Sequence, residues 1–514
     1  MSLGFGWTLR ADEERSNTFF RQDSSLVPEC YQDRMLARPL DKRRAYRARA
    51  WGKSLSPAAI VLGIILGASA SGLGQVPDSP ATASVAPASV APDSLNATDA
   101  LKTQGPSSEL TVKDTQGSKK ALADSSVPKT DPEKWNVKLG GHVQMDYVLW
   151  ANASDSIPNT YNYFNFRRLR LVADGTGYEN CDFRLQMTLE PEPFGDNPAD
   201  TNLTPQVKDA YFTMNEIPYL GRLRIGNFFV PYSLEQVTND TQNIFLERSI
   251  PTQTVFAADR EVGFAFYNCS QDERLTWTTG CFFDSISEGV KKRLDDNQGY
   301  RVSGRVTWLP YDNDQPKSRR LIHTGFGVLF TDDSDDRIRI RTRPQVSEGP
   351  RLIDSGLLKA DTYTSGNVEG AIVLGRFAVQ SEAFLGTVQM LNGDNPSLSG
   401  AYLHTSWFVT GESRRFERFG QHGAQFGRNA PFRNFRCKKG EFQPGAVELK
   451  SRWSHLDMNQ LGAGQYNDLT VGFNWYWSDR TRWMFDWIHP VTSAQTLYGP
   501  TVSDLLAMRF DFNW

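Results

Sequence analysis

Arginines recur at even spacing in several short stretches of this chain. The longest series is Arg337, Arg339, Arg341 and Arg343, and shorter ones are Arg168 and Arg170, Arg222 and Arg224, and Arg301 and Arg305. In an extended strand, residues two apart lie on the same face at steps of about 6.6 Å. Guanidinium groups in such a row offer planar, multidentate contacts to phosphate-like oxygens, and rings of arginine favour anions in pores. The spacing therefore predicts anion binding along β-strands.

Two other interpretations of these arginines stay open at the level of sequence. The acidic run DDSDD at 332–336 precedes Arg337 and would neutralise part of the long series, leaving it as the solvated edge of a loop. The arginines on strands could also pair with carboxylates across the sheet and mainly stiffen it.

The segments that must position these arginines alternate between apolar and polar residues. Asp182–Glu190 and Leu469–Trp477 show this most clearly, and about sixteen such segments can be counted. Short connections such as 217–220 and 478–480 alternate along the chain with long ones such as 191–205 and 332–350. We therefore expect an all-β fold, a transmembrane antiparallel β-barrel of about 16 strands. In hydrocarbon a sheet must join its own edges, because no backbone group there can stay unpaired.

A water-soluble β-sandwich would also alternate, so a further signal is needed. Trp475, Trp477, Trp483, Phe485 and Trp487 crowd one hairpin, as an aromatic girdle would, and the chain ends on MRFDFNW with Trp514. The mean hydropathy of −0.48 excludes a bundle of membrane helices. Together these features favour the barrel, which we expect to occupy residues 135–514.

The same alternation predicts which charged residues face the lumen of the barrel. The basic ones are Lys138, His142, Arg168, Arg170, Arg184, Arg222, Arg224, Arg301, Arg305, His323, Lys450, Arg452, Arg482 and Arg509. The acidic ones are Asp146, Glu190, Asp209, Glu261, Glu382, Glu448, Asp486 and Asp511. The predicted lumen is basic, which suits a channel for anions.

A polar connection at 229–260 separates two of the predicted strands and has no long helical pattern. A loop of this length inside a compact domain is normally functional. In a barrel it could enter the lumen and constrict it, with Pro231 fixing its start and with charged bonds from Glu235, Glu247, Arg248 and Arg260 to the wall. An ordinary surface loop is the alternative.

Several segments resemble the phosphate-selective porin O and P family of outer-membrane channels. They are FNFRRLRLVADG, VKDAYF, LGRLRIGNFFVPYSLEQ, FLERSIP, DREVGFAF, GYRVSGRVTWLPY, VTGESRRF, GAVELKSRWSHLDMN and TVGFNWYWSDRTRWMFDW, and they span residues 135–514 in order. The resemblance implies a sixteen-stranded barrel in the outer membrane, usually a homotrimer, that passes small anions.

The resemblance also implies roles for particular residues. Arg167 and Arg168, with Arg170 beside them, match the family's central anion site. The series from Arg337 to Arg343 resembles its arginine ladder, while the family's selectivity lysine has no counterpart that we can place. The terminal Trp514 resembles the signal read by the barrel assembly machinery. Arg222, Arg224, Arg301 and Arg305 would line the wall between these sites.

The first 134 residues have a different character from the rest of the chain. A basic run at 43–53, the apolar stretch Pro57–Gly67 and the triplet Ala68-Ser69-Ala70 predict a secretory signal within residues 1–70, placed more naturally behind a start at Met35 than at Met1. Residues 71–134 are rich in Ala, Pro and Ser and predict a disordered linker.

Other classes of function find little support. The chain has no G-x-S-x-G, H-E-x-x-H or P-loop motif, and its five cysteines lack metal-binding spacing, so we expect neither an enzyme nor a metal or other cofactor. Without residues 1–70, which carry eleven basic and seven acidic residues, the net charge falls from −3 to −7, so nucleic acid is not an expected partner.

The prediction for function is passive diffusion of small anions, with phosphate or polyphosphate as candidates. The alternatives are a general diffusion porin for small hydrophilic solutes and a closed structural barrel or adhesin. The Arg-rich connection at 414–443 falls where a tight periplasmic turn is expected, and the sequence offers no account of it.

Overall fold

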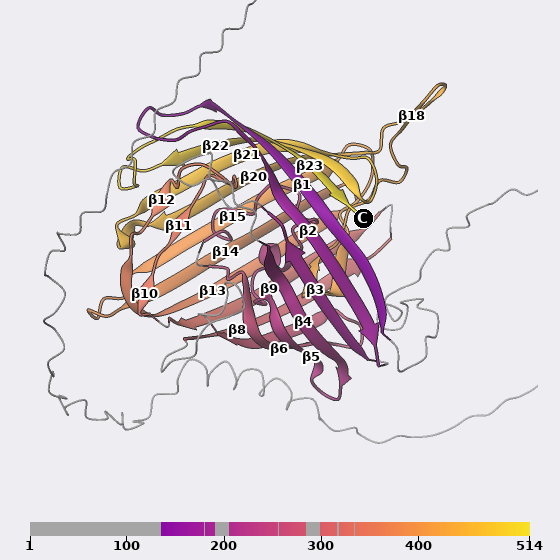
Figure 1. Ribbon diagram of the computed structural model, residues 1–514, viewed down its shortest axis with the longest axis horizontal. Helices are drawn as coiled ribbons and strands as arrows, with labels where there is room; N and C mark the ends of the chain where they lie inside the picture. The colour runs from indigo at the N-terminus through magenta and orange to yellow at the C-terminus, as the bar shows by residue number, and fades with distance from the viewer. Residues whose placement is uncertain are drawn as a thin grey trace, which may run out of the picture. The chain divides into compact units, whose positions relative to one another are not determined.

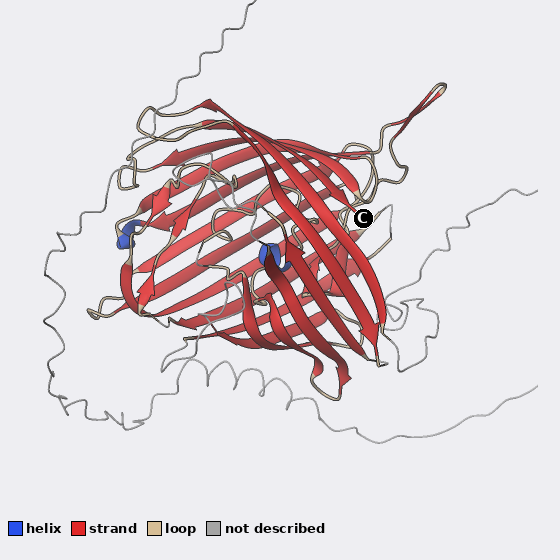
Figure 2. Ribbon diagram, viewed as in Figure 1, coloured by secondary structure: helices blue, strands red, loops and turns tan. Residues whose placement is uncertain are grey.

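A computed structural model describes residues 135–514, apart from 179, 191–204, 255, 284–298, 316–317 and 334. Nearly all of its regular structure is β-strand, and sixteen antiparallel strands close into a barrel (Figures 1 and 2). The predicted all-β barrel of about 16 strands is therefore confirmed. The predicted signal segment, residues 1–70, and the predicted linker, residues 71–134, lie outside the described residues.

The barrel strands follow one another in chain order. They are β1 (Asn136–Asn152), β2 (Tyr163–Gly177), β3 (Cys181–Thr188), β4 (Gln206–Ile217), β5 (Gly221–Phe229), β6 (Arg260–Cys269), β7 (Leu275–Phe283), β8 (Tyr300–Asn313), β9 (Arg320–Asp332), β13 (Leu358–Leu374), β14 (Phe377–Met390), β15 (Ser397–Phe408), β20 (Ala446–Met458), β21 (Gly464–Tyr476), β22 (Thr481–Thr492) and β23 (Asp504–Asn513). Each pairs with the next, and β23 pairs with β1.

Smaller elements lie in the connections. They are the helix α2 (Leu234–Val237), the strands β10 (Arg337–Ile338), β11 (Arg341–Thr342), β12 (Ile353–Asp354), β16 (Phe416–Gly420), β17 (Gly423–Phe426), β18 (Arg436–Lys438) and β19 (Glu441–Gln443), and the 3-10 helix η2 (Asn459–Leu461). None of the helices in the described part of the chain has the length and apolar character needed to cross a membrane.

The seam that closes the barrel runs between the first and last strands. The register of this pair places His142 opposite Asn513 and Asp146 opposite Arg509. Beyond it, the Trp514 amide donates to the Gly141 carbonyl at 3.1 Å. The C-terminal residues therefore complete the ring of backbone hydrogen bonds that a sheet needs in hydrocarbon.

Alternation along the strands separates a polar interior from an apolar exterior. In β20, Glu448, Lys450 and Arg452 are buried, whereas Leu449 and Trp453 are exposed on the outer face. Most of the charged residues predicted to face the lumen are buried or half-buried. Lys138 differs because it lies near the rim at the start of β1, where it is exposed.

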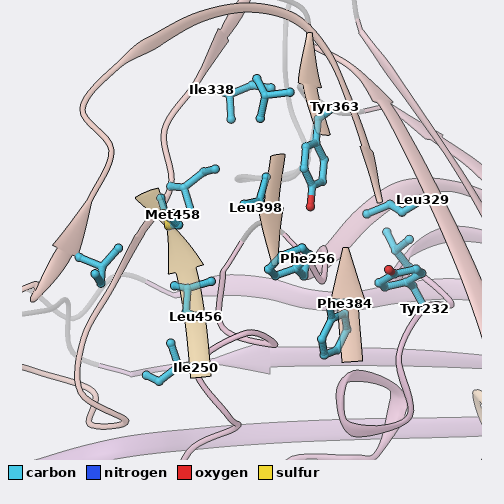
Figure 3. Close-up of a cluster of buried hydrophobic side chains, with 14 of the residues drawn as sticks. Tyr232, Ile250, Phe256, Leu329, Ile338, Tyr363, Phe384, Leu398, Leu456 and Met458 are labelled. Atoms are coloured by element: carbon cyan, nitrogen blue, oxygen red, sulfur yellow. The ribbon is translucent and has the colours of Figure 1, made fainter. Parts of the chain in front are cut away.

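Two long connections fold into the barrel from the same end. Residues 230–259, between β5 and β6, are mostly buried in the lumen and include α2 (Figure 2). Residues 333–357, between β9 and β13, lie against them, and apolar side chains from both connections and from the wall form one cluster (Figure 3). Tyr232, Phe256 and Ile338 are among its members, so the polar loops are held in place partly by an apolar core.

The connection between β15 and β20 is the exception among the short turns of the opposite end. In its first part, β17 is buried and β16 is half-buried, whereas the pair β18–β19 is mostly exposed and projects from the barrel near the C-terminus (Figure 1). One connection therefore contributes both a plug inside the barrel and an arm outside it.

Candidate functional site

A β-bulge turns three arginines of β2 toward the lumen. Gln144 pairs with Arg168 and Met145 with Phe166, so Arg167 has no partner opposite it in β1. In β2 the side chains that face the lumen have odd residue numbers before the bulge and even residue numbers after it, because a bulge adds one residue to its strand. Arg167, Arg168 and Arg170 consequently reach the same region of the lumen.

Asp240 lies in the connection at 230–259, here called the lumen loop, and forms ion pairs with three arginines. Its carboxylate lies 3.1 Å from Arg168 Nε, 2.9 Å from Arg170 Nη1 and 2.8 Å from Arg248 Nη2. Burial alone would raise the pKa of this carboxyl, but the surrounding arginines lower it well below its usual range. Two of the arginines expected at the central anion site are thus neutralised by the loop.

Glu247 fixes a second point of the loop to the wall. It accepts from Arg167 Nε at 2.7 Å and from Arg509 Nη2 at 2.8 Å, and Arg509 is paired with Asp146 across the closing seam. The same balance of burial against neighbouring arginines lowers the pKa of the Glu247 carboxyl. In these contacts of Asp240 and Glu247, the lumen loop supplies the acids and the wall supplies arginines.

The start of helix α2 docks on a single wall carboxylate. Glu382 of β14 accepts from Ser233 Oγ at 3.1 Å and from the backbone amides of Leu234 and Glu235 at 3.1 and 2.8 Å. Helix starts present unpaired amides of this kind, and Glu382 satisfies two of them. Neighbouring Pro231 is buried at the point where the loop leaves β5.

The remaining charged residues predicted for the loop have different partners. Glu235 pairs with Arg452 of the wall at 3.2 Å, and Arg260 pairs with Asp209 of β4 at 2.7 Å. Arg248 instead binds inside the loop, where it donates to the carbonyl oxygens of Glu235, Gln236 and Thr238. Its role in the structure is to brace the loop rather than to reach the wall.

Small residues in the wall make room for the loop. A Cβ placed on Gly400 would lie 2.9 Å from atoms of Pro251, and one placed on Gly327 would lie 3.1 Å from the ring of Tyr232. Any larger residue at Gly400 would collide with Pro251 and force the loop to move away from the wall. The close approach of loop and wall therefore depends on these glycines.

In the arginine series at 337–343, exposed and buried side chains alternate as predicted, but the segment does not form one continuous strand. Only β10 and β11 are regular, and Arg337, Arg339 and Arg341 are exposed while Ile338 and Ile340 are buried. Arg339 pairs with Asp354 at 2.6 Å. The buried isoleucines explain the difference, because they fasten this segment to the apolar cluster instead of extending a sheet.

Part of this series borders an open cavity above the bulge. The cavity has a volume of about 180 Å³ and is lined by Arg167, Glu247, Gln253, Arg341, Thr342, Arg343, Val346, Ser347 and Arg351. Four of these nine residues are arginines and one is a carboxylate. Cationic groups therefore outnumber acids around this cavity.

Wall arginines at the other end of the barrel bind the plug formed by β16 and β17. Arg222 donates to the Gly420 carbonyl and Arg224 to the Gln421 carbonyl, both at 3.0 Å, and Arg305 donates to the Ala424 carbonyl at 2.9 Å. Arg305 also pairs with Glu369 at 2.7 Å. Arg301, near the start of β8, is paired with Glu261 of β6, two strands away in the wall. These arginines hold backbone and carboxylate groups in place.

The sequence matches one family over nearly the whole barrel. The profile of the phosphate-selective porin O and P family covers residues 137–514. The chain belongs to this family. Membership identifies this porin as a channel of the outer membrane rather than an enzyme.

Several solved porins can be superposed on this member of the porin O and P family. A loop-deletion form of OmpT from Vibrio cholerae shares 9% identity, with a TM-score of 0.48, over 75% of this chain and 100% of that chain. The anion-selective porin from Comamonas acidovorans shares 12% identity, with a TM-score of 0.43, over 74% and 100% of the two chains. The comparison with curated proteins returned no match.

Several lumen residues of this porin were missed by the sequence analysis. Glu369 alternates with Val368 on β13 and could have been found by the same parity as its neighbours. Asp240, Arg414 and His422 lie in connections, where no alternation marks an inward side chain. Arg414 and His422 are buried, and the Arg414 guanidinium lies 3.7 Å from the centre of the Phe426 ring.

Proposed function

We propose that this porin passes small anions, phosphate-like ones among them, through an arginine-lined pore narrowed by the 229–260 loop. The observation that carries the proposal is the cavity bordered by Arg167, Arg341, Arg343 and Arg351, with Glu247 as its one acid. Charges in a narrow, partly dehydrated passage are screened less than surface charges, so this excess would attract anions and repel cations.

The proposed path continues from this cavity to the bulge arginines and then past the plug. At the bulge, Asp240, Glu247 and Glu190 offset the positive charge of the wall, so the excess of positive charge there is smaller. Anion preference would accordingly be set mainly at the mouth by Arg341 and Arg343. Family membership supports phosphate as a permeant, and the guanidinium groups offer the multidentate contacts that it needs.

A general diffusion porin is the second candidate, and the pairing at the bulge favours it. If every arginine of the passage were balanced as Arg168 and Arg170 are, small solutes would pass according to size. The two candidates differ in ion selectivity, which electrophysiology measures directly.

The test uses purified protein in planar bilayers under a potassium chloride gradient. We expect the wild type to show an anion-selective reversal potential and Arg341→Glu with Arg343→Glu to shift it toward cations. Arg274→Glu with Arg320→Glu changes the same charge at exposed positions outside the lumen and should leave it unaltered. Millimolar phosphate should also lower the chloride current of the wild type. A wild type without anion preference would establish the general diffusion porin, and silence would establish a closed barrel.

The homotrimer and the secretory signal belong to the same proposal. Family membership supports the trimer, and the basic, apolar and small-residue order at 43–70 supports export. Cross-linking in native membranes and N-terminal sequencing of the mature protein test these two points. Recognition of Trp514 by the barrel assembly machinery is a further expectation from the resemblance.

A further inference from the structure

Residues 432–445 form an arm that leaves the barrel at the end where the C-terminus lies (Figure 1). Strands β18 and β19 pair through Lys438 and Glu441, which leaves a tight turn of Lys439 and Gly440. Gly440, the second residue of the turn, has a φ of +86°, a value that a type II turn requires at this position and that glycine adopts without strain. The arm is therefore a formed hairpin, separate from the barrel sheet.

The base of the arm is fastened to the outer face of the barrel. Phe435 N donates to the Trp477 carbonyl at 2.7 Å, and Trp475 Nε1 donates to the Pro444 carbonyl at 2.6 Å. The Phe435 ring stacks on Trp477 at 5.2 Å between ring centres. On the inner side, Phe432 N donates to Glu412 Oε1 at 3.0 Å.

Trp475 shows that this anchor lies on the lipid-facing side. It continues the outward-facing set of β21, whose members Leu469, Val471 and Phe473 are exposed. Trp475 also packs against Trp477, with 5.4 Å between the ring centres. Aromatic side chains gather in this way where a barrel meets the lipid headgroups. The arm therefore starts at the membrane interface on the periplasmic side, where the short turns and the C-terminus lie.

The free part of the arm is basic and partly apolar. It holds four basic residues, Arg433, Arg436, Lys438 and Lys439, against one acid, Glu441. Arg436 pairs with Glu441 at 3.3 Å, whereas the other three make no ion pair with any residue that the structure describes. Phe442 is 71% exposed and Phe432 is 49% exposed. Cations together with an exposed aromatic side chain are the combination that holds a segment at an anionic membrane surface.

We propose that the arm binds anionic phospholipid headgroups, such as those of phosphatidylglycerol, in the periplasmic leaflet of the outer membrane. The cations would bind headgroup phosphates, since basic residues close to an anionic membrane surface are attracted to it. Phe442 would enter the boundary between headgroups and acyl chains, where aromatic rings are favoured.

The dimensions of the arm favour lipid over a deeper periplasmic partner. A strand of three residues spans about 10 Å, and the headgroup region is about 5–8 Å thick on each side of the hydrocarbon. Starting from the aromatic girdle, the hairpin ends within or just beyond the headgroups. A partner such as the peptidoglycan layer would account for the lysines but not for the exposed Phe442.

The affinity of detergent-solubilised protein for phosphatidylglycerol and phosphatidylcholine can be measured by native mass spectrometry. We expect the wild type to retain phosphatidylglycerol preferentially. Lys438→Glu with Lys439→Glu should weaken this binding about tenfold or more. Phe442→Ser should weaken the binding of both lipids. The matched control is Arg274→Glu with Lys359→Glu, which reverses two exposed cations outside both the arm and the lumen. Channel conductance, which rests on the lumen, should be unchanged in every variant.

A second measurement locates the arm itself. Cys437 is exposed, whereas the other described cysteines are half-buried, so a fluorophore can be attached to it. In liposomes, lipids with a nitroxide at the headgroup should quench this fluorophore, and the Lys438→Glu, Lys439→Glu variant should reduce the quenching. Equal retention of the two lipids by the wild type would overturn the proposal, and so would unaltered lipid binding in the variants. It would also be overturned if the Lys438→Glu, Lys439→Glu variant lost binding to purified peptidoglycan but kept its binding to lipid.

Discussion

The Asp240 carboxylate lies 2.9 Å from the guanidinium of Arg170, a residue of the barrel wall seventy positions earlier in the chain. This pair joins the lumen loop to the bulge on β2, and it neutralises one of the arginines proposed to attract anions. The loop therefore occupies part of the lumen and also supplies negative charge to it.

Removal of this charge should increase anion preference. In Asp240→Asn, Arg168, Arg170 and Arg248 lose their shared carboxylate, and the potential at the bulge becomes more positive. We expect the permeability ratio of chloride to potassium to rise about fivefold, which corresponds to about 1 kcal/mol. Reversal potentials in a salt gradient measure this ratio, with Asp272→Asn in an exposed turn as the control. An unaltered or reduced ratio would contradict the assigned role.

Loss of the Glu382 anchor should loosen the loop. Glu382→Ala leaves Ser233 Oγ and the amides of Leu234 and Glu235 without their acceptor, and each buried donor left unsatisfied costs about 1–3 kcal/mol. We expect larger and noisier single-channel currents, together with faster proteolysis in the loop. Ser381→Ala alters the neighbouring outward position and should behave as the wild type. Wild-type currents in Glu382→Ala would show that other contacts are sufficient to hold the loop.

Acid should release the loop only at low pH. The pKa values of Asp240 and Glu247 are lowered in the folded protein. A lowered pKa means that the anchoring is complete above the ordinary carboxyl pKa of about 4 and is lost as the pH falls through the lowered value. Conductance should thus be constant from pH 7 to about 4.5 and rise below about pH 4. The double variant Asp240→Asn, Glu247→Gln should remove this pH dependence of the conductance. A change in wild-type conductance between pH 5 and 7 would show that other titratable groups control the loop.

Alternation in the sequence was sufficient to predict the wall of the barrel. The inward positions of Arg452, Arg482 and Arg509 follow from their apolar neighbours, since one face of each strand meets lipid. Arg167 shows the limit of this reasoning. Alternation counted back from Leu169 and Leu171 assigns it to the lipid side, because the bulge shifts the phase of the alternation between Phe166 and Leu169. In the sequence analysis, only the family resemblance indicated the lumen.

The plug could not be predicted, and its contacts explain why. Arg222 and Arg224 bind it through the backbone carbonyls of Gly420 and Gln421, which are present at every position and carry no sequence signal. The lumen loop was predictable in outline because its length and its charged residues are unusual. Its actual partners, such as Glu382, depend on how strands far apart in the sequence face one another.

The C-terminal residues should be essential for insertion of the barrel. Phe512 pairs with Val143 of β1, and Trp514 exchanges backbone hydrogen bonds with Gly141 across the seam. Deletion of residues 512–514 would leave edge groups of β1 unpaired in hydrocarbon, where each costs several kcal/mol. We expect the truncated chain to accumulate in the periplasm in an aggregated or degraded form, as fractionation would show. A normal yield in the outer membrane would mean that the seam closes without these residues.

Removal of the plug should open the periplasmic side of the pore. Deletion of residues 418–425 takes away the carbonyl groups that Arg222 and Arg224 bind, so the passage becomes wider and two cations are freed. We expect single-channel conductance to rise about twofold or more and anion preference to increase, because unscreened arginines in a narrow pore attract anions. The matched control deletes eight residues of the same connection, 436–443, which lie outside the barrel and should leave conductance at the wild-type value. Equal currents in the two deletions would show that ions bypass the plug, whereas a rise in conductance without a gain in anion preference would show that Arg222 and Arg224 find other partners.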